Sequence, residues 1–269
     1  MKTILVPIDA DEGQEARLQA AFDLARACSG QVVAVQVTPY AAYAVGDAGL
    51  GAFPITSLIE AVEGERRRER TAVEARFAAE AVEWQWVARD GDLVDSLAML
   101  ARLADIVVMN SGPFSAAASA KIALTGDVAI GAPTPVLAVP PASRGLMVAG
   151  PALVAWDGSQ EAALAMRAAM PLLRMAASVT VLTVEEKNPD LRARDAAAYM
   201  ARHGINADVM ERSADGDSIE TVIRAVLTET GVTWMVQGAY GHSRLRQTIF
   251  GGVTRGLLGD APVPMLIAH

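Results

Sequence analysis

Residues 233–258 read TWMVQGAYGHSRLRQTIFGGVTRGLL. The stretch begins with a short apolar run, which is typical of a buried strand. Gly238 and Gly241 follow at a spacing of three, and the pair Gly251 and Gly252 comes just before a segment with helical character. The stretch therefore predicts a strand, a glycine-containing loop and a helix, which form one unit of an α/β fold.

The glycines of this stretch also suggest a binding site. Glycine adopts backbone angles that other residues cannot, and it lets a ligand approach the main chain closely. A glycine pair at the start of a helix leaves unpaired N–H groups at the positive end of the helix dipole, and that geometry binds phosphate. The alternative is that the glycines only form tight turns. Because four glycines share this spacing between a strand and a helix, we favour the phosphate site.

The composition limits the classes of protein to consider. The chain has 269 residues, of which 52% are hydrophobic, and this suffices for one large or two ordinary domains. No apolar run reaches the roughly 20 residues that span a bilayer, and no signal-peptide pattern opens the chain, so we expect a cytoplasmic protein without a membrane partner. The net charge of −8 argues against a nucleic-acid partner. Cys28 is the only cysteine, so we predict no disulfide and no cysteine-based metal site within one chain.

The sequence contains an internal repeat. Residues 4–9 predict a strand that ends at Asp9, and residues 152–157 predict a strand that ends at Asp157. A helical pattern and a second apolar strand follow each of them at a nearly constant offset. Strands and helices keep alternating to the end of each half. Each half therefore predicts a doubly wound, five-stranded parallel sheet with helices on both faces, which is a Rossmann-like α/β fold.

The repeat also predicts domain limits and helix starts. The expected domains are residues 1–141 and 151–269, joined by a stretch rich in proline and glycine. Ser159 is placed as the N-cap of the second half's first helix. Asp-Gly-Asp triplets at 90–92 and 215–217 each precede a predicted helix. Acids at a helix start interact favourably with the dipole, and we favour this role over direct ligand binding.

The two halves differ by one insertion. Residues 39–66 predict a loop that the second half nearly lacks, and a charged helical stretch follows it. Residues 65–70 of this region read ERRRER. The basic cluster is either a partner site or a solvated helix face. The neighbouring acids lead us to favour the solvated face.

The spacing Gly-x2-Gly-x9-Gly, carried by Gly238, Gly241 and Gly251, resembles the nucleotide-binding motif of the universal stress protein family, in its ATP-binding branch. The family's motif ends in Gly-Ser or Gly-Thr, whereas Gly252 holds the last position here. The missing hydroxyl would reduce affinity, while the backbone N–H remains. Two universal stress domains in tandem, of the adenine nucleotide alpha hydrolase-like type, also fit the length and the repeat.

The resemblance implies an ATP site in the second half, with AMP or ADP as alternative ligands and Mg²⁺ as an accompanying ion. Asp157 and Val184 would hold the adenine, and Gly238 would lie beside the ribose. The phosphates would bind to N–H groups and one hydroxyl of the loop and helix. The residues expected at this site are Ala155, Trp156, Asp157, Val184, Gln237, Gly238, Gly241, Gly251, Gly252, Val253 and Thr254.

The first half is expected to bind no nucleotide. When the halves are aligned on the strand before the loop, Asn110 takes the place of Gly238 and Pro113 takes that of Gly241. Proline has no N–H and a fixed φ, so it cannot replace a glycine that faces a phosphate.

Two further expectations concern the end of the first half. Asp127 would fall at the position of Gly252, where its carboxylate would repel phosphate. The first half would instead serve as a pseudo-symmetric partner. By resemblance to the family, residues 136–139 would pair with residues 265–268 inside one chain.

The expected function is that of a nucleotide-binding regulatory protein in the stress response, with an unidentified protein partner and no catalytic residue. Slow ATP hydrolysis is compatible with this hypothesis. The alternative is an interaction module of the same fold that uses no nucleotide. An adenylating enzyme fits least, because no Ser-Gly-Gly-x-Asp-Ser loop follows either first strand. The chain would form a pseudo-dimer with itself, and a homodimer of chains is a further option. His242, Arg244 and Arg246 are either phosphate contacts or solvated loop residues, and we favour the latter.

Overall fold

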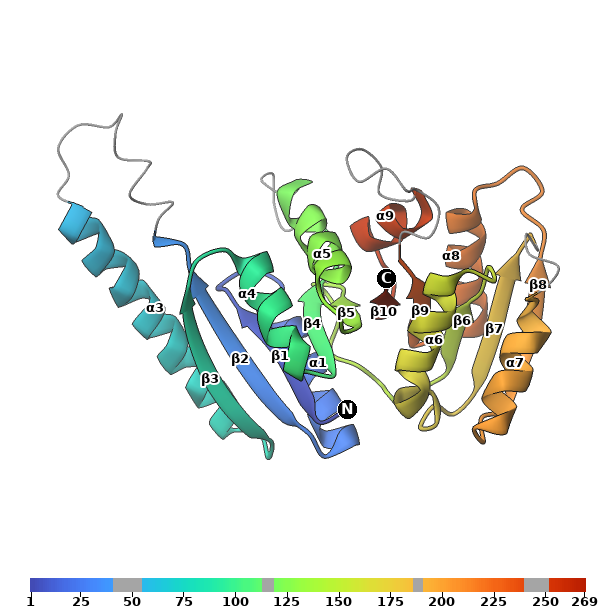
Figure 1. Cartoon of the computed structure of the whole chain (residues 1–269), viewed down its shortest axis with the longest axis horizontal. Coiled ribbons are helices and arrows are strands. Elements are labelled where there is room, and N and C mark those ends of the chain that lie inside the picture. Colours follow the sequence, from blue (N-terminus) through green and yellow to red (C-terminus); the bar gives the residue numbers. More distant parts are fainter. Residues whose placement is uncertain (41–54, 113–118, 186–190, 240–251) are drawn as a thin grey trace.

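The computed structural model describes residues 1–40, 55–112, 119–185, 191–239 and 252–269. Its ten strands form one sheet in the order β3-β2-β1-β4-β5-β10-β9-β6-β7-β8 (Figure 1). Strands β1 to β5 belong to the first half of the sequence, and strands β6 to β10 belong to the second half. The same strand order therefore occurs twice, as two halves that meet at β5 and β10.

Every predicted strand of the first half is present. The elements of this half are β1 (Thr3–Ile8), α1 (Gln14–Cys28), β2 (Gln31–Thr38), α3 (Ile55–Ala78), β3 (Glu83–Asp90), α4 (Leu93–Leu100), the short 3-10 helix η2 (Ala101–Leu103), β4 (Ile106–Asn110), α5 (Ser119–Gly131) and β5 (Val136–Val139).

The second half repeats this plan. Its elements are β6 (Ala152–Ala155), α6 (Gln160–Leu173), β7 (Val179–Val184), α7 (Ala193–Arg202), β8 (Ala207–Arg212), α8 (Ile219–Thr230), β9 (Trp234–Gly238), α9 (Gly252–Gly259) and β10 (Met265–Ala268). None of the described helices combines the length and the apolar character needed to cross a membrane.

The two halves are joined through β5 and β10. Neighbouring strands within each half run parallel, whereas β5 and β10 are antiparallel, with Leu266 opposite Leu137 and Ile267 opposite Val136. All four residues of β5 and all four of β10 are buried. The predicted pairing of residues 136–139 with residues 265–268 is confirmed.

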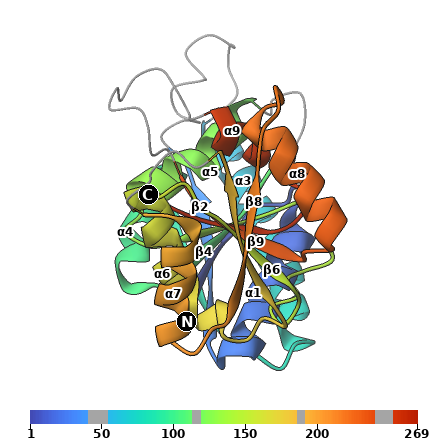
Figure 2. The ribbon, with the colours of Figure 1, turned by 90° about the vertical axis from the view of Figure 1, so that its right-hand side faces the viewer.

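The helices cover both faces of the sheet, as predicted. One core lies under α1, α3, α6 and α7, and it receives Leu137 and Leu266 from the central strands. The other core lies under α4, α5, α8 and α9, and it receives Val136 and Ile267. Strand side chains alternate between faces, so neighbouring residues of β5 and β10 enter different cores. Figure 2 looks along the sheet and shows its strands crossing at changing angles, as expected for a twisted sheet.

Local sequence signals explain several helix starts. The Ser159 Oγ accepts a hydrogen bond from Ala162 N at 3.1 Å, so its predicted capping of α6 is confirmed. Asp92 caps α4 through Asp95 N at 3.0 Å, as the dipole argument favoured for the first Asp-Gly-Asp triplet. At the second triplet the cap is Ser218, one residue later.

One predicted loop limit is wrong. The loop was expected to extend over residues 39–66, but α3 begins at Ile55 and runs to Ala78. Pro54 directly precedes the helix, and residues 55–63 contain neither proline nor glycine. Proline favours the position just before or at a helix start, so the helix can form from this point onward.

Residues 140–151, between β5 and β6, contact both halves. The Leu146 N–H donates to Asp23 Oδ2 of α1 at 2.8 Å, and the Trp234 indole N–H of β9 donates to Val148 O at 3.2 Å. Gly145 has a φ of +130°, and a Cβ there would lie 2.3 Å from Asp23 Oδ2. The connecting segment is therefore packed against both halves. The domain limits 1–141 and 151–269 stay a prediction.

The central strand pair predicts a large effect of one leucine. Leu137→Ala should lower the free energy of unfolding by about 2–5 kcal/mol, because Leu137 is fully buried opposite Leu266 and the shorter side chain leaves a cavity. The measurement is urea-induced unfolding. Leu103→Ala is the matched control, since Leu103 is 89% exposed, and its effect should stay within about 0.5 kcal/mol. Equal effects of the two changes would contradict the description of β5 as a buried central strand.

Candidate functional site

The carboxyl ends of β6, β7 and β9 lie at one edge of the sheet. Strand β6 pairs with β7 on one side and with β9 on the other, so the strand order reverses between β6 and β9. Ligands of open parallel sheets bind beyond the strand ends at such a point. Ala155 ends β6, Val184 ends β7 and Gly238 ends β9, so the structure brings these three predicted residues to this edge.

The segment after β6 is tightly held. Trp156 N donates to Leu182 O at 2.8 Å, and Thr183 Oγ1 donates to Trp156 O at 2.6 Å. The Trp156 ring is buried, and its indole N–H donates to Leu191 O at 2.9 Å. Asp157 is exposed, and its Oδ1 accepts from Ser159 N at 3.0 Å. Trp156 thus anchors the segment, while the Asp157 carboxylate supports the start of α6 and remains accessible to a ligand.

Gly238 is a glycine for a structural reason. A Cβ at this position would lie 2.4 Å from Ala162 N and 2.7 Å from Glu161 C, both in the backbone of α6. Real Cβ atoms do not come so close to backbone atoms. The end of β9 therefore lies directly against the first turn of α6, which only glycine permits.

The first turn of α9 is joined to the end of β9. Thr254 is buried, and its Oγ1 accepts a hydrogen bond from Gln237 Nε2 at 3.1 Å. The Gln237 Oε1 is buried and has no hydrogen-bond partner within the described part of the chain. Gly252 is the first residue of α9, and no described atom lies within 4 Å of the position of a Cβ there. Among the described residues, the α9 amino terminus is therefore uncovered beside Gly252, and Val253 follows it, half-buried.

Part of the predicted motif cannot be placed. Gly241 and Gly251 lie outside the described residues, as do His242, Arg244 and Arg246. The motif's described residues meet at one place, because Gln237 and Gly238 end the strand and Gly252 and Thr254 begin the helix.

The corresponding point of the first half is occupied by the Arg17 side chain of α1. Arg17 is 3% exposed, and its Nε donates to Pro7 O at 3.0 Å. Its guanidinium also donates to Asp9 O at 3.2 Å, to the Asp11 carboxylate at 3.2 and 3.3 Å, and to the side-chain oxygen of Asn110. Burial lowers the pKa of Arg17, and the charge of Asp11 acts against this shift. These contacts tie the ends of β1 and β4 together with the protein's own cation.

Asn110 has a role that its counterpart Gly238 cannot have. Its Nδ2 donates to Gly13 O at 3.1 Å and to Val139 O at 3.2 Å. Its backbone oxygen accepts from Thr125 Oγ1 at 2.8 Å. The side-chain amide of Asn110 therefore links β4 to the start of α1 and to β5, and its backbone oxygen links β4 to α5. Sequence reasoning missed Arg17, although a charged residue next to Leu18 on a helix with an apolar face was a usable signal.

The predicted position of Asp127 is wrong. Proline pairs with the same spacing precede β5 and β10, and counting back from them aligns Thr125 with Thr254 and Asp127 with Gly256. Asp127 lies well inside α5 and is exposed, whereas Gly252 is the first residue of α9. The extra residues of the first half lengthen α5 at its amino end. Pro113, the other predicted obstacle, lies outside the described residues.

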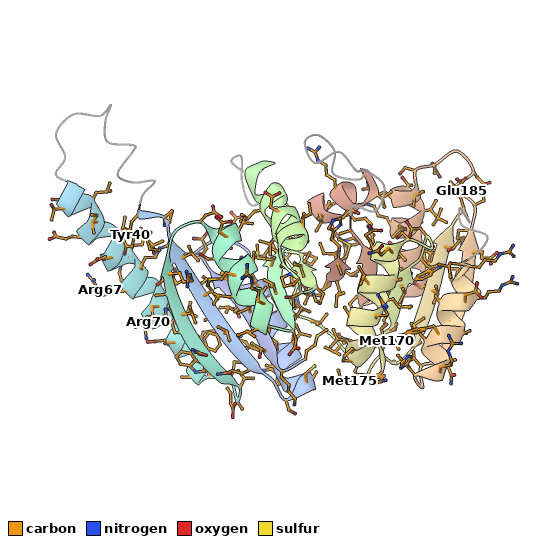
Figure 3. The ribbon with its side chains drawn as sticks, in the orientation of Figure 1. Tyr40, Arg67, Arg70, Met170, Met175 and Glu185 are labelled. Carbon is orange, nitrogen blue, oxygen red and sulfur yellow. The ribbon has the colours of Figure 1, made fainter. Side chains whose placement is uncertain are left out.

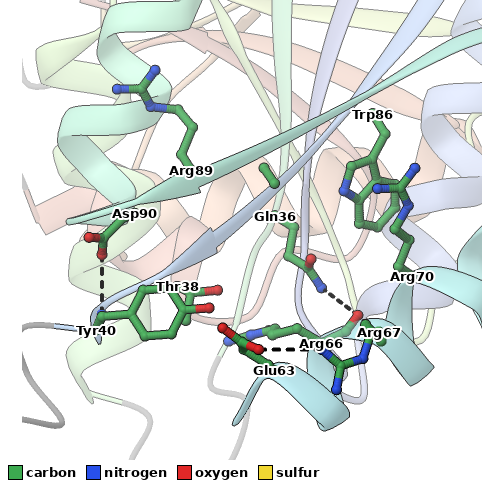
Figure 4. Close-up of a pocket in the computed structure, with 11 residues that line it drawn as sticks. Gln36, Thr38, Tyr40, Glu63, Arg66, Arg67, Arg70, Trp86, Arg89 and Asp90 are labelled. Carbon is green, nitrogen blue, oxygen red and sulfur yellow. Dashed lines mark hydrogen bonds and ion pairs between the residues drawn. The ribbon is translucent and has the colours of Figure 1, made fainter. Parts of the chain in front are cut away.

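The basic cluster at residues 65–70 is only partly a solvated face. Glu65, Arg67, Arg68 and Arg70 are exposed, as we favoured. Glu69 is buried, however, and Arg66 is half-buried between Glu69 at 2.9 Å and Asp9 at 3.8 Å. A cavity of about 350 Å³ lies between this part of α3 and the strands β2 and β3 (Figure 4).

The family model for the universal stress proteins matches residues 1–140, just over half of the chain. The chain belongs to the universal stress protein family. This match lies in the half with Arg17 at its strand crossover, whereas the glycine motif lies in the other half.

Two solved structures share the arrangement of this family member. A universal stress protein from Archaeoglobus fulgidus has a TM-score of 0.76 at 16% identity, and the alignment covers 99% of this chain and 95% of that chain. A protein of unknown function from Pseudomonas aeruginosa has a TM-score of 0.59 at 14% identity, covering 100% and 92%. No curated protein sequence matches the chain. At these identities the likeness shows the fold, including its double-length form.

The contrast between two glycines of the motif is testable. Gly238→Ala should lower the free energy of unfolding by more than about 2 kcal/mol, because the new methyl group overlaps the α6 backbone. Gly252→Ala should change it by less than about 1 kcal/mol, since the position is open. Thermal and urea unfolding measure both. A harmless Gly238→Ala change would contradict the close contact of β9 with α6.

The Arg17 network makes a separate prediction. Arg17→Ala should lower the free energy of unfolding by about 3–5 kcal/mol, because it leaves the Asp11 carboxylate and the Asn110 amide without their buried partner. Arg68→Ala, at an exposed position of α3, should change it by less than about 0.5 kcal/mol. Chemical denaturation measures both, and similar small effects would mean that the Arg17 network contributes little to stability.

Proposed function

We propose that this universal stress protein binds one adenine nucleotide, ATP, at the strand crossover of its second half. The observation that carries the proposal is the amino terminus of α9, where no atom of the described residues lies within 4 Å of a Cβ placed at Gly252. Gly252, the second glycine of the pair, is the first residue of this helix. The hydrogen bond between Thr254 and Gln237 joins the helix start to the end of β9. Helix amino termini bind phosphate through their free N–H groups and the positive end of the dipole.

The described residues fit an adenine nucleotide in three further ways. Gln237 Oε1, which has no hydrogen-bond partner among the described residues, can accept a hydrogen bond from a ligand hydroxyl or amino group. Asp157 presents an exposed carboxylate at the end of β6, where it would accept from the adenine. Val184 is half-buried at the end of β7 and offers an apolar contact. Mg²⁺ would accompany the phosphates, since oxygen ligands from nucleotides are typical of its sites.

The proposal includes one site per chain. In the first half the guanidinium of Arg17 occupies the crossover between β1 and β4, and Asn110 stands at the position of Gly238. The first half is then a structural partner of the nucleotide-binding half, as expected from the sequence.

A regulatory role would use the position of α9 at the centre of the molecule. Leu258 O in the last turn of α9 accepts a hydrogen bond from Gly112 N, which follows β4 of the first half, at 2.5 Å. Figure 1 shows α5 and α9 next to each other above β5 and β10. A phosphate at the start of α9 would therefore bias a helix that both halves contact. We propose that the protein acts in the cytoplasm in this way, as a binding protein in the stress response and not as an enzyme.

The alternative is an interaction module that uses no nucleotide. Gly252 supplies no hydroxyl, and the Thr254 hydroxyl is already bonded to Gln237. Phosphate contacts would then come mainly from N–H groups, and affinity would be correspondingly lower.

Calorimetric titration with ATP and Mg²⁺ tests the proposal. We expect one site per chain in the wild type. Gly252→Asp should weaken binding by about tenfold or more, because a carboxylate at the helix start repels phosphate and competes for the same N–H groups. Gly252→Ser should tighten it several-fold, since it adds a hydroxyl in open space.

Substitution of the equivalent aspartates Asp157 and Asp9 tests which half binds ATP. Asp157→Asn should weaken ATP binding, whereas Asp9→Asn, at the same position of the first half, should not. Absence of binding in the wild type would support the interaction module. Two sites per chain would contradict the role proposed for Arg17. Release of phosphate measured in the same samples would show whether turnover accompanies binding.

A further inference from the structure

The cavity beneath α3 lies away from the strand crossover of the second half, and Arg66 in its wall pairs with Asp9 after β1 of the first half. Its volume is about 350 Å³, and its walls come from α3 and from the outer strands β2 and β3 (Figure 4). Figure 3 shows Tyr40, Arg67 and Arg70 at the outer end of the first half, and Glu185, the residue that follows β7, at the other end of the molecule. A pocket of this size accepts a small organic ligand.

The cavity wall is cationic. Its described lining residues include four arginines, Arg66, Arg67, Arg70 and Arg89, and two acids, Glu63 and Asp90. Arginines thus outnumber acids among the described lining residues, in a chain whose net charge is −8, while Asp9, Glu69 and Glu74 lie beside them as ion-pair partners. A concave site lined by one sign of charge attracts ligands of the opposite sign.

The two arginines at the mouth can exchange their present partners for a ligand. Arg67 pairs with Glu63 at 3.4 Å and Arg70 with Glu74 at 2.7 Å, each one helical turn away. The two arginine side chains are 70% and 50% exposed. Exposed pairs of this kind contribute little to stability, so an incoming anion competes with them readily. Arg66 is different, because it pairs with the buried carboxylate of Glu69 and also with the half-exposed carboxylate of Asp9.

The floor of the cavity is aromatic. In Figure 4 the indole of Trp86 lies between Gln36 and the guanidinium of Arg70, whose Cζ is 5.3 Å from the ring centroid. The Trp86 Nε1 is buried and has no hydrogen-bond partner among the described residues. A buried N–H without an acceptor is unfavourable. The Gln36 side-chain nitrogen cannot accept from it, because that nitrogen is itself a donor, to Glu69 and to Arg66 O. The cavity floor therefore has a donor whose acceptor is not among the described residues.

The second half has different residues at the corresponding positions. Strand pairing places Val209 where the first half has Trp86, and Thr183 where it has Gln36. Val209 is 42% exposed, and the Thr183 hydroxyl is bonded to Trp156 O. Helix α7 spans 10 residues, whereas α3 spans 24. The Trp86 floor and the greater length of α3 therefore distinguish the first half from the described part of the second.

We propose that this cavity binds a small planar organic anion, of the aromatic carboxylate class. The ring of the ligand lies against the Trp86 indole, and its carboxylate accepts hydrogen bonds from Arg67 and Arg70. Arginine suits this role because its planar fork matches a carboxylate and stacks on aromatic rings. The first half, with Arg17 at its strand crossover, thus has a ligand site of its own at the sheet edge.

The test uses the full chain and 2-naphthoate, followed by NMR of the tryptophan indole N–H groups and by calorimetry. We expect the Trp86 signal, assigned with Trp86→Phe, to shift to saturation, with smaller changes at Trp156 and Trp234. The double variant Arg67→Gln and Arg70→Gln should weaken binding by about tenfold or more, since it removes both charged donors. Arg68→Gln is the matched control, on the same helix but outside the cavity lining, and it should bind as the wild type does.

Two further probes separate the contribution of the ligand's charge to binding from that of its aromatic ring. Neutral 2-naphthamide should bind at least about tenfold more weakly than 2-naphthoate, because it lacks the charge. Inorganic phosphate alone should not shift the Trp86 signal to saturation at the concentrations that 2-naphthoate requires. The proposal is overturned by an unmoved Trp86 signal, by equal affinity for the amide, by equal affinity for phosphate, or by the same loss in Arg68→Gln. ATP titration of these variants should match the wild type, so failure here would leave the nucleotide proposal standing.

Discussion

The antiparallel pairing of β5 with β10 is the contact on which the rest of the structure depends. Both strands are entirely buried, and each would be an apolar sheet edge if its half stood alone. Such edges invite uncontrolled pairing with other chains. Because the strands pair with each other, the sheet extends to ten strands and both cores run through the junction. The remaining edges, β3 and β8, carry mostly exposed residues, which suits strands that end a sheet.

The two halves share one topology and use its crossover points differently. Gly238 lets β9 lie against the α6 backbone. In the first half a buried arginine and an asparagine amide take up the hydrogen-bonding groups at the ends of β1 and β4. A single substitution would not convert one arrangement into the other, since Arg17 requires Asp11 and Asn110 as partners. The fold thus provides the position, and side-chain chemistry decides its use.

Much of this architecture follows from periodicity and local signals. Apolar strands at a repeating offset predicted two halves of alternating strands and helices, and Ser159 marked a helix start that depends only on its neighbours. What failed involved contacts or loop lengths that no local pattern encodes. The partners Arg17 and Asn110 are 93 residues apart, so their meeting depends on the folded sheet. Asp127 was misplaced because counting through a loop cannot show that α5 begins earlier than α9. The predicted nucleotide residues at 241 and 251 stay predictions.

The segment of residues 140–151 has a consequence for how the two halves could diverge. Symmetric homodimers must place the same residue at both equivalent positions, so any change acts twice. Here a peptide segment held by Asp23 and Trp234 keeps two unequal halves together in fixed proportion. Their association is intramolecular and does not depend on protein concentration. Position 165 of α6 corresponds to position 17 of α1, at the offset that relates Asp157 to Asp9. One chain can therefore retain an arginine at position 17 and an alanine at position 165, so the two halves are free to specialise separately.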